Sequence, residues 1–387
     1  MGKGTHRMNI LIATDVTRQK EAGTAAVLIN YAHELRKLGH DVECWFFEDV
    51  LDPAASGKRF ASLAFAARAA RRILRAPKKY DLVLLHAPVG CVYGLWRRLF
   101  GPAEAPPYVF VMQGILERYA HAMRREARKS RAWHFGWKNR LWYRVYHRTI
   151  FECAIRTADY GVSSNREAWT YPEIRFDREP GRLWYVPNGT EECFFTSRQY
   201  KMNTPLRFLY VGTWLDRKGV YYLADAFRLV LQQRPNVELT VAGCLCSEDT
   251  VRGLFAPEIQ SKVKVLPFVQ RDGMPQLYSE HDIFVFPSLM EGMPLALLEA
   301  MATAMPVVTT ETCGMADIVE DGFNGMLVPT ANAGKLALAI EQLCDSVELR
   351  ERIGREAQRT MRRYTWERVT RKLEMVLSLA VKQGTTN

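Results

Sequence analysis

Residues 286–302 read FPSLMEGMPLALLEAMA, and no other part of the chain says as much about its architecture. The apolar run from Ile283 to Phe286 predicts a short buried parallel strand, and Pro294 suits the first position of a following helix. Such a helix start offers free N–H groups and the positive end of the helix dipole to an anion, typically phosphate. We therefore expect a phosphate-binding loop at the carboxyl end of this strand.

Two carboxylates flank the expected anion site. Glu291 lies in the loop before the helix, and Glu299 lies one to two turns inside it. Carboxylates repel phosphate, so their natural partners are neutral hydroxyl groups on either side of it. A nucleoside diphosphate sugar has this layout, with ribose hydroxyls, a diphosphate and then sugar hydroxyls. The segment therefore predicts a nucleotide-sugar site.

The same segment resembles the Glu-x7-Glu signature of the retaining GT-B glycosyltransferases of family 4. That signature runs through Pro-Ser, Glu-Gly, a Pro and Glu-Ala-Met-Ala, and the continuation PVVTT at 306–310 and GFNGMLV at 322–328 is similar to it as well. The resemblance implies an α/β GT-B fold, in which two doubly wound Rossmann-like domains face an interdomain cleft. It also implies retaining transfer of a sugar from a nucleotide-diphosphate donor to a polysaccharide, lipid-linked or small-molecule acceptor.

Bulk properties agree with a two-domain globular protein. The chain has 387 residues, too many for one ordinary core, with 48% hydrophobic and 25% charged residues. Its net charge of +11 favours an anionic partner, which could be nucleic acid, anionic lipid or a phosphorylated substrate. The eight cysteines are scattered along the sequence. The sequence also shows no apolar run long enough to span a bilayer and no hydrophobic signal core. We therefore expect a reduced cytosolic protein.

The order of apolar runs predicts two alternating α/β series. The first strand and helix, 8–13 and 25–38, precede a second strand at 42–47, an order that predicts parallel pairing with a right-handed crossover. We expect an acceptor-binding Rossmann-like domain at 1–195, a nucleotide-sugar-binding one at 196–365 and, by resemblance, a helix at 366–387 that crosses back to the first domain. The remaining expected strands are 82–86, 108–112, 160–163, 183–186, 207–211, 237–242, 263–265 and 283–286.

The stretch GTWLDRKG at 212–219 follows the first strand of the second series. The resembling family usually has Gly-Arg here and then Lys-Gly, with both cations neutralising the leaving diphosphate. Lys218 keeps its place after Gly212, but Thr213 stands where the Arg would be, so Arg217 is the candidate substitute. The alternative is that Arg217 and Lys218 only solvate a helix start.

The resemblance assigns the other donor-binding positions of the second domain. Glu291 would accept hydrogen bonds from sugar hydroxyls and Glu299 from ribose hydroxyls, whereas the alternatives are a helix N-terminal charge and a solvated helix position. The backbone at Phe268 and Val269 would receive the nucleobase. The helix start that would meet the diphosphate comprises Gly292, Met293, Pro294 and Leu295.

We expect the reaction to need no metal ion and no cofactor besides the nucleotide-sugar substrate. The chain contains no Asp-x-Asp pair, the usual bidentate arrangement for a divalent cation bound to a nucleotide sugar. A departing diphosphate concentrates negative charge on its bridging oxygen. Lys218 and the helix start at 292–295 are therefore expected to stabilise it.

In the first domain, Gly23 and Thr24 resemble the small-residue loop that approaches the donor phosphates, although a plain turn is the alternative. Gln113 stands where the family commonly has a His that hydrogen-bonds the transferred sugar. Gln can donate or accept a hydrogen bond but cannot take a proton. The resemblance implies a front-face mechanism, in which the leaving phosphate oxygen accepts the acceptor's proton. His86 and His121 are possible helpers or structural residues.

A basic segment rich in aromatic residues extends from Arg118 to Arg148. It suits an amphipathic helix on anionic lipid headgroups, single-stranded nucleic acid, or a solvated helix whose aromatics enter the core. Because the resembling family handles its acceptor in the first domain, we favour a lipid-linked or other anionic acceptor and expect no nucleic acid. The predicted location is the cytoplasm, with possible peripheral attachment to the inner face of the membrane.

Two other functions stay open. A nucleotide-sugar epimerase would keep the fold and change the chemistry. Because Thr213 and Gln113 depart from the family pattern, a non-catalytic basic surface-binding protein with a degenerate pocket is the second alternative. The glycosyltransferase hypothesis predicts that Gly23, Gln113, Lys218 and Glu291 converge on one interdomain cleft.

Overall fold

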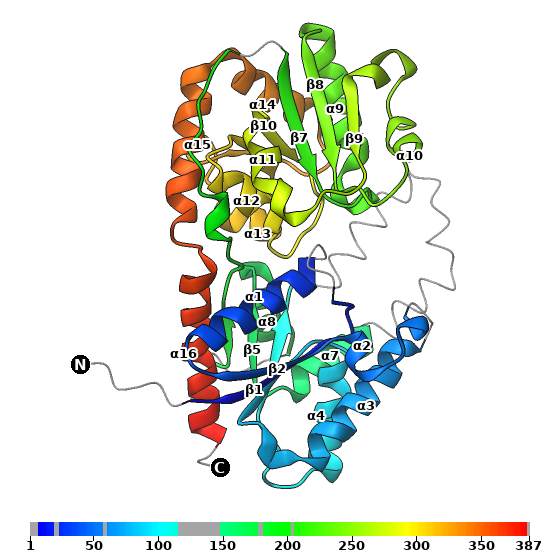
Figure 1. The fold of residues 1–387 in the computed structure, drawn as a ribbon, viewed down its shortest axis with the longest axis vertical. Coiled ribbons are helices and arrows are strands. Elements are labelled where there is room, and N and C mark those ends of the chain that lie inside the picture. Colours follow the sequence, from blue (N-terminus) through cyan, green and yellow to red (C-terminus); the bar gives the residue numbers. More distant parts are fainter. Residues whose placement is uncertain are drawn as a thin grey trace, which may run out of the picture. The chain divides into compact units, whose positions relative to one another are not determined.

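A computed structural model describes residues 7–18, 23–56, 60–114, 148–176, 181–202 and 205–384. Two compact units form from these residues, and each has its own parallel sheet (Figure 1). Unit 1 holds the described residues up to 114, those from 148 to 188 and the final helix, and unit 2 holds 189–365. His121 and all of the basic segment except Arg148 lie outside the described residues.

The sheet of unit 1 has the strand order β2-β1-β3-β4-β5-β6, and every neighbouring pair is parallel. Ile10 pairs with Val42 on one side and Leu82 on the other, which makes β1 a central strand. The strands are β1 (Asn9–Ala13), β2 (Asp41–Trp45), β3 (Leu82–Leu85), β4 (Tyr108–Met112), β5 (Tyr160–Ser163) and β6 (Leu183–Tyr185).

The second strand is shorter than the sequence predicted. Its apolar run continues to Phe47, but β2 ends at Trp45 and Phe47 begins the helix α2 (Phe47–Val50). The reason is local, because the carboxylate of Asp49 accepts a hydrogen bond from the backbone N–H of Phe46. This contact caps a helical turn and stops strand pairing.

Helices cover both faces of this sheet. Leu11, Val83 and Phe110 point toward α3 (Ala61–Arg75), α4 (Val89–Phe100) and α7 (Arg148–Thr157) in one core. Alternate strand residues point the other way, toward α1 (Gly23–Lys37) and α16 (Trp366–Gly384), because side chains alternate along a strand. The remaining helix of the unit is α8 (Arg166–Phe176).

The final helix belongs to unit 1, although the chain reaches it only after unit 2. It packs along α1 (Figure 1). The rings of Tyr31 and Trp366 meet there edge to face, with 5.5 Å between their centres. Farther along, Nε2 of His40 lies 3.0 Å from Oε1 of Glu374. The roles predicted for 1–195, 196–365 and 366–387 stay predictions.

The sheet of unit 2 has the order β12-β11-β10-β7-β8-β9 and is also parallel throughout. The direction of winding reverses between β7 and β10, and open α/β sheets bind ligands beside the carboxyl ends of such neighbours. The strands are β7 (Leu206–Val211), β8 (Val237–Ala242), β9 (Val263–Leu266), β10 (Ile283–Phe286), β11 (Val307–Thr310) and β12 (Met326–Val328).

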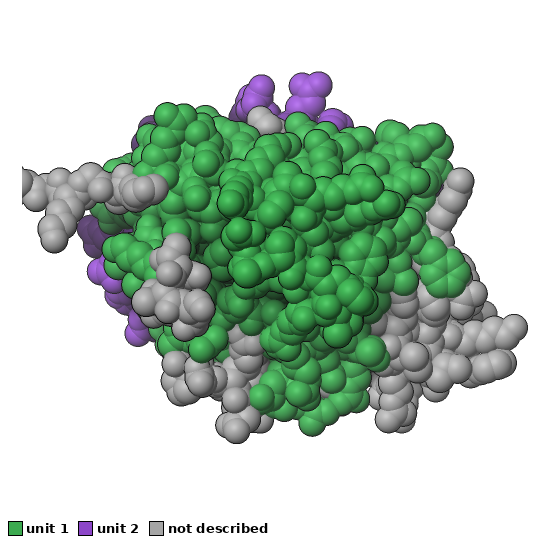
Figure 2. All heavy atoms as spheres, turned by 90° about the horizontal axis from the view of Figure 1, so that it is seen from below, with its two compact units in different colours: residues 1–117, 133–188, 366–387 green, residues 118–132, 189–365 purple. Residues whose placement is uncertain are grey.

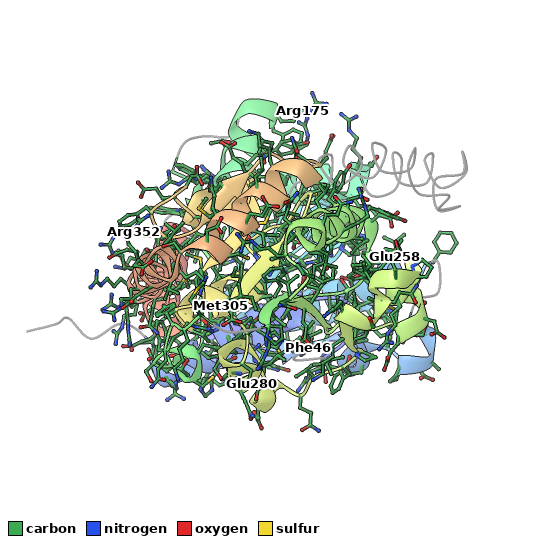
Figure 3. The ribbon with its side chains drawn as sticks, turned by 90° about the horizontal axis from the view of Figure 1, so that it is seen from above. Phe46, Arg175, Glu258, Glu280, Met305 and Arg352 are labelled. Carbon is green, nitrogen blue, oxygen red and sulfur yellow. The ribbon has the colours of Figure 1, made fainter. Side chains whose placement is uncertain are left out.

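Helices of unit 2 pack in pairs, α9 against α14 and α12 against α15. Met305 lies in the interior of the unit, whereas Glu258 and Arg352 point outward (Figure 3).

No helix in the described part of the chain is long and apolar enough to cross a bilayer. The helices are α9 (Val220–Gln233), α10 (Glu248–Arg252), α11 (Met274–Ser279), α12 (Leu295–Ala302), α13 (Cys313–Ile318), α14 (Ala333–Asp345) and α15 (Val347–Met361).

Candidate active site

Two loops meet at the carboxyl ends of β7 and β10. The first contains Arg217 and Lys218 and ends at Gly219, whose φ is +73°. A Cβ on Gly219 would overlap the carbonyl oxygen of Pro287, so the glycine lets this loop lie directly on the start of the second loop. The backbone N–H of Leu289 donates to the carbonyl of Arg217 at 2.8 Å. Both loops are therefore held together by backbone contacts.

The turn before α12 is held from its other side. Gly314, in the first turn of α13, donates its N–H to the carbonyl oxygen of Gly292 at 2.9 Å. A Cβ at Gly314 would overlap that same oxygen and crowd Met293. The backbone at 292–293 thus lies against a neighbouring helix start, which limits its freedom to move.

The helix α12 starts one residue later than predicted. Pro294 has φ −75° and ψ 121°, an extended conformation, and its carbonyl oxygen accepts the first hydrogen bonds, from Leu297 and Leu298. It is therefore the N-cap residue, and Leu295 is the first helical residue. The N–H groups of Leu295 and Ala296 have no acceptor within the helix, and the predicted binding of an anion at this helix start stays a prediction.

Glu291 lies at the centre of an ionic cluster. Nζ of Lys218 lies 2.6 Å and Nη1 of Arg217 lies 3.0 Å from the same oxygen, Oε1 of Glu291. The hydroxyl of Ser288 donates to that oxygen at 2.8 Å. Both cations therefore point to one place, and the largely buried side chain of Lys218 excludes the alternative that it only solvates a helix start.

Charge in this cluster is set by opposing effects. Burial disfavours the ionised carboxylate, but the charges of Lys218 and Arg217 outweigh it and lower the pKa of Glu291. Burial is also the largest influence on Lys218 and lowers its pKa, although Glu291 opposes the shift. Two basic side chains thus surround a single carboxylate. An anion is favoured beside this cluster.

Glu299 lies in a second ionic cluster that the sequence did not predict. Its Oε1 accepts from Nη1 of Arg271 at 2.6 Å, and its Oε2 accepts from the hydroxyl of Tyr278 at 3.0 Å. Glu299 is buried, which excludes a solvated helix position. Arg271 also donates to Glu191 at 3.1 Å and lies over the ring of Phe194. Burial opposes its charge, but Glu299 and Glu191 outweigh burial and raise its pKa.

The remaining predicted donor positions of unit 2 follow the same strands. Gly212 and Thr213 come directly after β7, and a Cβ on Gly212 would lie 3.9 Å from Nζ of Lys218. Phe268 is exposed and Val269 is half-buried in the loop after β9. The predicted backbone contact with a nucleobase stays a prediction.

In unit 1 the predicted residues lie near the carboxyl edge of the sheet. The hydroxyl of Thr24 donates to Oε1 of Gln113 at 3.0 Å, so the start of α1 meets the end of β4. Nε2 of Gln113 and Nε2 of His86 are buried without a hydrogen-bond partner among the described residues. A Cβ on Gly23 would meet nothing within 4 Å, so no neighbour in the described structure requires a glycine there.

Among the residues that the structure describes, no group of three or more His, Cys, Asp or Glu side chains could hold a metal ion. This leaves the prediction of a metal-independent reaction untested. The convergence predicted for Gly23, Gln113, Lys218 and Glu291 likewise stays a prediction. The structure shows Lys218 with Glu291 in unit 2, and Gln113 with Thr24 in unit 1.

Two Rossmann-like units, each with a parallel six-stranded sheet, match the GT-B class of fold, which solved glycosyltransferase structures share. The family described as Glycosyl transferases group 1 matches residues 195–360, which is most of unit 2. Unit 2 is therefore the part of the chain that is similar to this family.

Solved structures agree on the fold over nearly the whole chain. Sucrose-phosphate synthase from Thermosynechococcus elongatus aligns with a TM-score of 0.77 and 18% identity, covering 98% of this chain and 100% of that one. WaaG, a glycosyltransferase involved in lipopolysaccharide biosynthesis, aligns at 0.72 and 17%, covering 95% and 99%. HepE of Anabaena, solved with UDP and glucose, aligns at 0.69 and 20%, covering 96% and 100%.

Curated relatives match a shorter stretch. An uncharacterized glycosyltransferase of Methanocaldococcus jannaschii is 30% identical over 176 residues, which are 45% of each chain. The amylovoran biosynthesis glycosyltransferase AmsK of Erwinia amylovora is 33% identical over 149 residues, 37% of each chain. The chain thus spans less than half the length of these two relatives.

Proposed function

We propose that this protein is a metal-independent glycosyltransferase that moves a sugar from a nucleoside diphosphate sugar to a glycan or lipid-linked acceptor. One observation carries the proposal: Arg217, Lys218 and Glu291 form a single cluster at the switch point of a sheet whose sequence matches the group 1 family. A ligand with both a diphosphate and neutral hydroxyls suits this cluster. The cations suit the diphosphate, and the free lone pairs of Glu291 suit the hydroxyls.

The transfer step follows from these charges. The bond between the anomeric carbon and the phosphate oxygen breaks, and a bond from that carbon to the acceptor oxygen forms. Lys218 and the first-turn amides of α12 stabilise the negative charge that builds up on the departing oxygen. In the retaining, front-face form that the resemblance implies, this oxygen takes the proton of the acceptor hydroxyl. Gln113 then needs only to hydrogen-bond the transferred sugar.

Glu299 is proposed to accept hydrogen bonds from the ribose. Arg271 and Tyr278 each occupy one lone pair of its carboxylate, and each oxygen has another lone pair free. Relatives named for amylovoran and capsular polysaccharide biosynthesis support a glycan acceptor. The structure of HepE with UDP-glucose supports a nucleoside diphosphate sugar as donor. We place the reaction in the cytoplasm, at or near the membrane.

The test is a screen of nucleotide sugars that measures both nucleotide release and product formation. We expect one donor to give nucleotide release that increases with added acceptor. Lys218→Met should reduce the rate at least about a hundredfold, the usual loss when a group that stabilises transition-state charge is removed. Glu291→Gln should also reduce the rate strongly, because it removes the charge that holds Lys218 and Arg217 in place. The control is Arg228→Gln, which alters an exposed residue of α9 and should leave the rate unchanged.

Other outcomes point elsewhere. Conversion of one nucleotide sugar into another, without release of nucleotide, would indicate an epimerase. Binding of nucleotide with no turnover of any donor would favour a non-catalytic protein. Full activity of Glu291→Gln or Lys218→Met would show that the site is wrongly assigned.

A further inference from the structure

The end of α4 exposes large apolar side chains that the proposed reaction does not use. Leu99 and Phe100, its last two residues, are 68% and 80% exposed, and Leu95, one turn earlier, is 42% exposed. Single exposed apolar residues are ordinary on a protein surface. Leu95 and Leu99 are four residues apart and therefore lie on one face of α4, and Phe100 adds the most exposed of the three side chains at the end of the helix.

The neighbouring helix α3 presents a basic face. Its exposed arginines recur at helical spacing, and Lys78 lies in the short turn that follows the helix. Arg72 lies over the ring of Trp45, but no ion pair with a described carboxylate involves Arg71 or Arg75. The exposed arginines of α3 are Arg68, Arg71, Arg72 and Arg75.

These two features lie side by side. The helices α3 and α4 pack against each other, and both run from the carboxyl edge of the sheet to its amino edge, because each precedes a parallel strand (Figure 1). Their last turns therefore end together. Nζ of Lys78 lies 3.6 Å from Oε1 of Glu104, which places the residues after α3 beside those after α4. We call Arg71, Arg75, Lys78, Leu95, Leu99 and Phe100 the α3–α4 edge.

The charge of the α3–α4 edge is positive. Three carboxylates near these helix ends already have cationic partners: Glu104 pairs with Lys78, Asp159 with Arg97 and Glu43 with Lys79. No carboxylate in the described part of the chain pairs with Arg71 or Arg75, so these two positive charges are in excess there. Figure 2 shows unit 1 from below, which is the side where α4 ends in Figure 1.

We propose that the α3–α4 edge docks unit 1 on a bilayer that carries anionic headgroups. Leu95, Leu99 and Phe100 enter the boundary between headgroups and acyl chains, while Arg71 and Arg75 contact lipid phosphates. A second copy of the chain fits less well, because a two-fold contact would bring this excess of arginines close to its own copy. The inference rests on the described residues of unit 1 alone, and neither on glycosyl transfer nor on the segment 118–148.

Sedimentation with lipid vesicles tests the docking directly. The full-length chain should sediment with vesicles of phosphatidylglycerol and phosphatidylcholine, and much less with phosphatidylcholine alone. A double variant, Leu99→Ser with Phe100→Ser, should need about tenfold more lipid for half-maximal binding. The variant Arg71→Gln with Arg75→Gln should show a similar loss and a weaker dependence on salt, because fewer charges are screened.

Matched controls lie in unit 2. Leu338 on α14 is 53% exposed, so Leu338→Ser removes a comparable apolar side chain, and Arg228→Gln removes an exposed arginine from α9. Both should bind vesicles as the unmodified chain does. Circular dichroism and thermal unfolding confirm that each variant is folded.

Three results would overturn the proposal. The unmodified chain could fail to bind anionic vesicles. The Leu99 and Phe100 variant could bind as tightly as the unmodified chain, which would assign any binding to other residues. Sedimentation velocity without lipid could reveal a dimer that the same variant dissociates, which would make a second copy the occupant.

Discussion

At the scale of single residues, Arg271 joins Glu299 of the candidate donor site to Glu191. Its guanidinium spans Glu299 and Glu191, and so connects α12 with the segment that opens unit 2. A planar group with several donors can hold two carboxylates at once, whereas a lysine ammonium cannot do so in the same geometry. If Glu299 accepts the ribose hydroxyls, Arg271 fixes the carboxylate that receives them.

The corresponding prediction concerns donor affinity. Arg271→Met should weaken binding of the nucleoside diphosphate about tenfold, because Glu299 loses the cation that orients it, and Arg271→Lys should lose less. Isothermal titration with the free nucleotide measures this without turnover. If Arg271→Met lowers the melting temperature but leaves nucleotide affinity unchanged, the arginine has a structural role only.

His86 gives a second prediction at this scale. Burial lowers its pKa from 6.5 to about 4, so the unfolded chain takes up a proton well before the folded one does. Stability should therefore fall as the pH drops from about 6.5 to about 4, by at most about 3 kcal/mol. His86→Asn should remove this part of the acid sensitivity of the melting temperature.

The control for that change is His33→Asn, which alters an exposed histidine of the same unit. It should leave the dependence of melting temperature on pH as in the unmodified chain. Equal slopes for the chain and for His86→Asn between pH 7 and pH 5 would contradict the predicted role of the buried imidazole.

At the scale of elements, the approach of two loops depends on glycine. Gly219 and Gly322 have nearly the same backbone, with φ of +73° and +70°, but only Gly219 has a carbonyl where a Cβ would lie. Gly322→Ala should cost about 1–2 kcal/mol from the left-handed backbone alone. Gly219→Ala should cost a further 1–3 kcal/mol or so from the overlap with Pro287.

This pair of variants separates backbone strain from loop packing. Because Gly219 adjoins Lys218, the displaced loop should also weaken nucleotide binding, which Gly322→Ala should not do. Chemical unfolding and nucleotide titration of both variants measure the two effects. Equal stability of the two variants would mean that the loop moves away at no cost.

How much of each element could be predicted depended on whether local signals agreed. The strands at 108–112, 160–163, 237–242 and 283–286 were predicted to the residue, because each is a mainly apolar run bounded by polar, glycine or proline residues. The second strand was predicted too long. Trp45 and Phe47 are both large and apolar, so the apolar pattern alone does not show that the strand ends between them. The boundary is set by Asp49, which caps the following helical turn. Pro294 was one position off for a similar reason, because proline suits both the N-cap and the first helical turn.

The ionic partners of the site were less predictable than its motif. Glu291, Glu299 and Lys218 lie in a recognisable pattern, but Arg271 is a single arginine in a polar loop, far from Glu299 in sequence. The hydroxyl of Tyr278 on α11 donates to the carbonyl of Ala296 and to Glu299 on α12, and this tertiary contact holds the preceding loop near that carboxylate. The clustering of Arg217 with Lys218 was equally uncertain from the sequence, because adjacent loop residues often point apart, and here the backbone turn before Gly219 lets both reach Glu291.

At the scale of the whole molecule, unit 1 is completed by residues from both ends of the chain. The helix α16 follows unit 2 in sequence, yet its buried side chains, such as Leu373 and Leu377, complete the face of the first sheet beside α1. The first unit therefore cannot finish folding until the last helix has been made. Unit 2 is contiguous and has no such requirement among its described residues.

This topology predicts unequal effects of two changes on the same helix. Leu373→Ala should destabilise unit 1 by about 2–5 kcal/mol, since it leaves a cavity in a fully buried position, and unit 2 should unfold as before. Met375→Ala, only two residues away but 68% exposed, should change stability by no more than about 0.5 kcal/mol. Hydrogen exchange resolved by peptide distinguishes the units: Leu373→Ala should accelerate exchange in β1, β3 and α1, and leave β7 and β10 protected. Faster exchange in both sheets would show that the two units unfold as one.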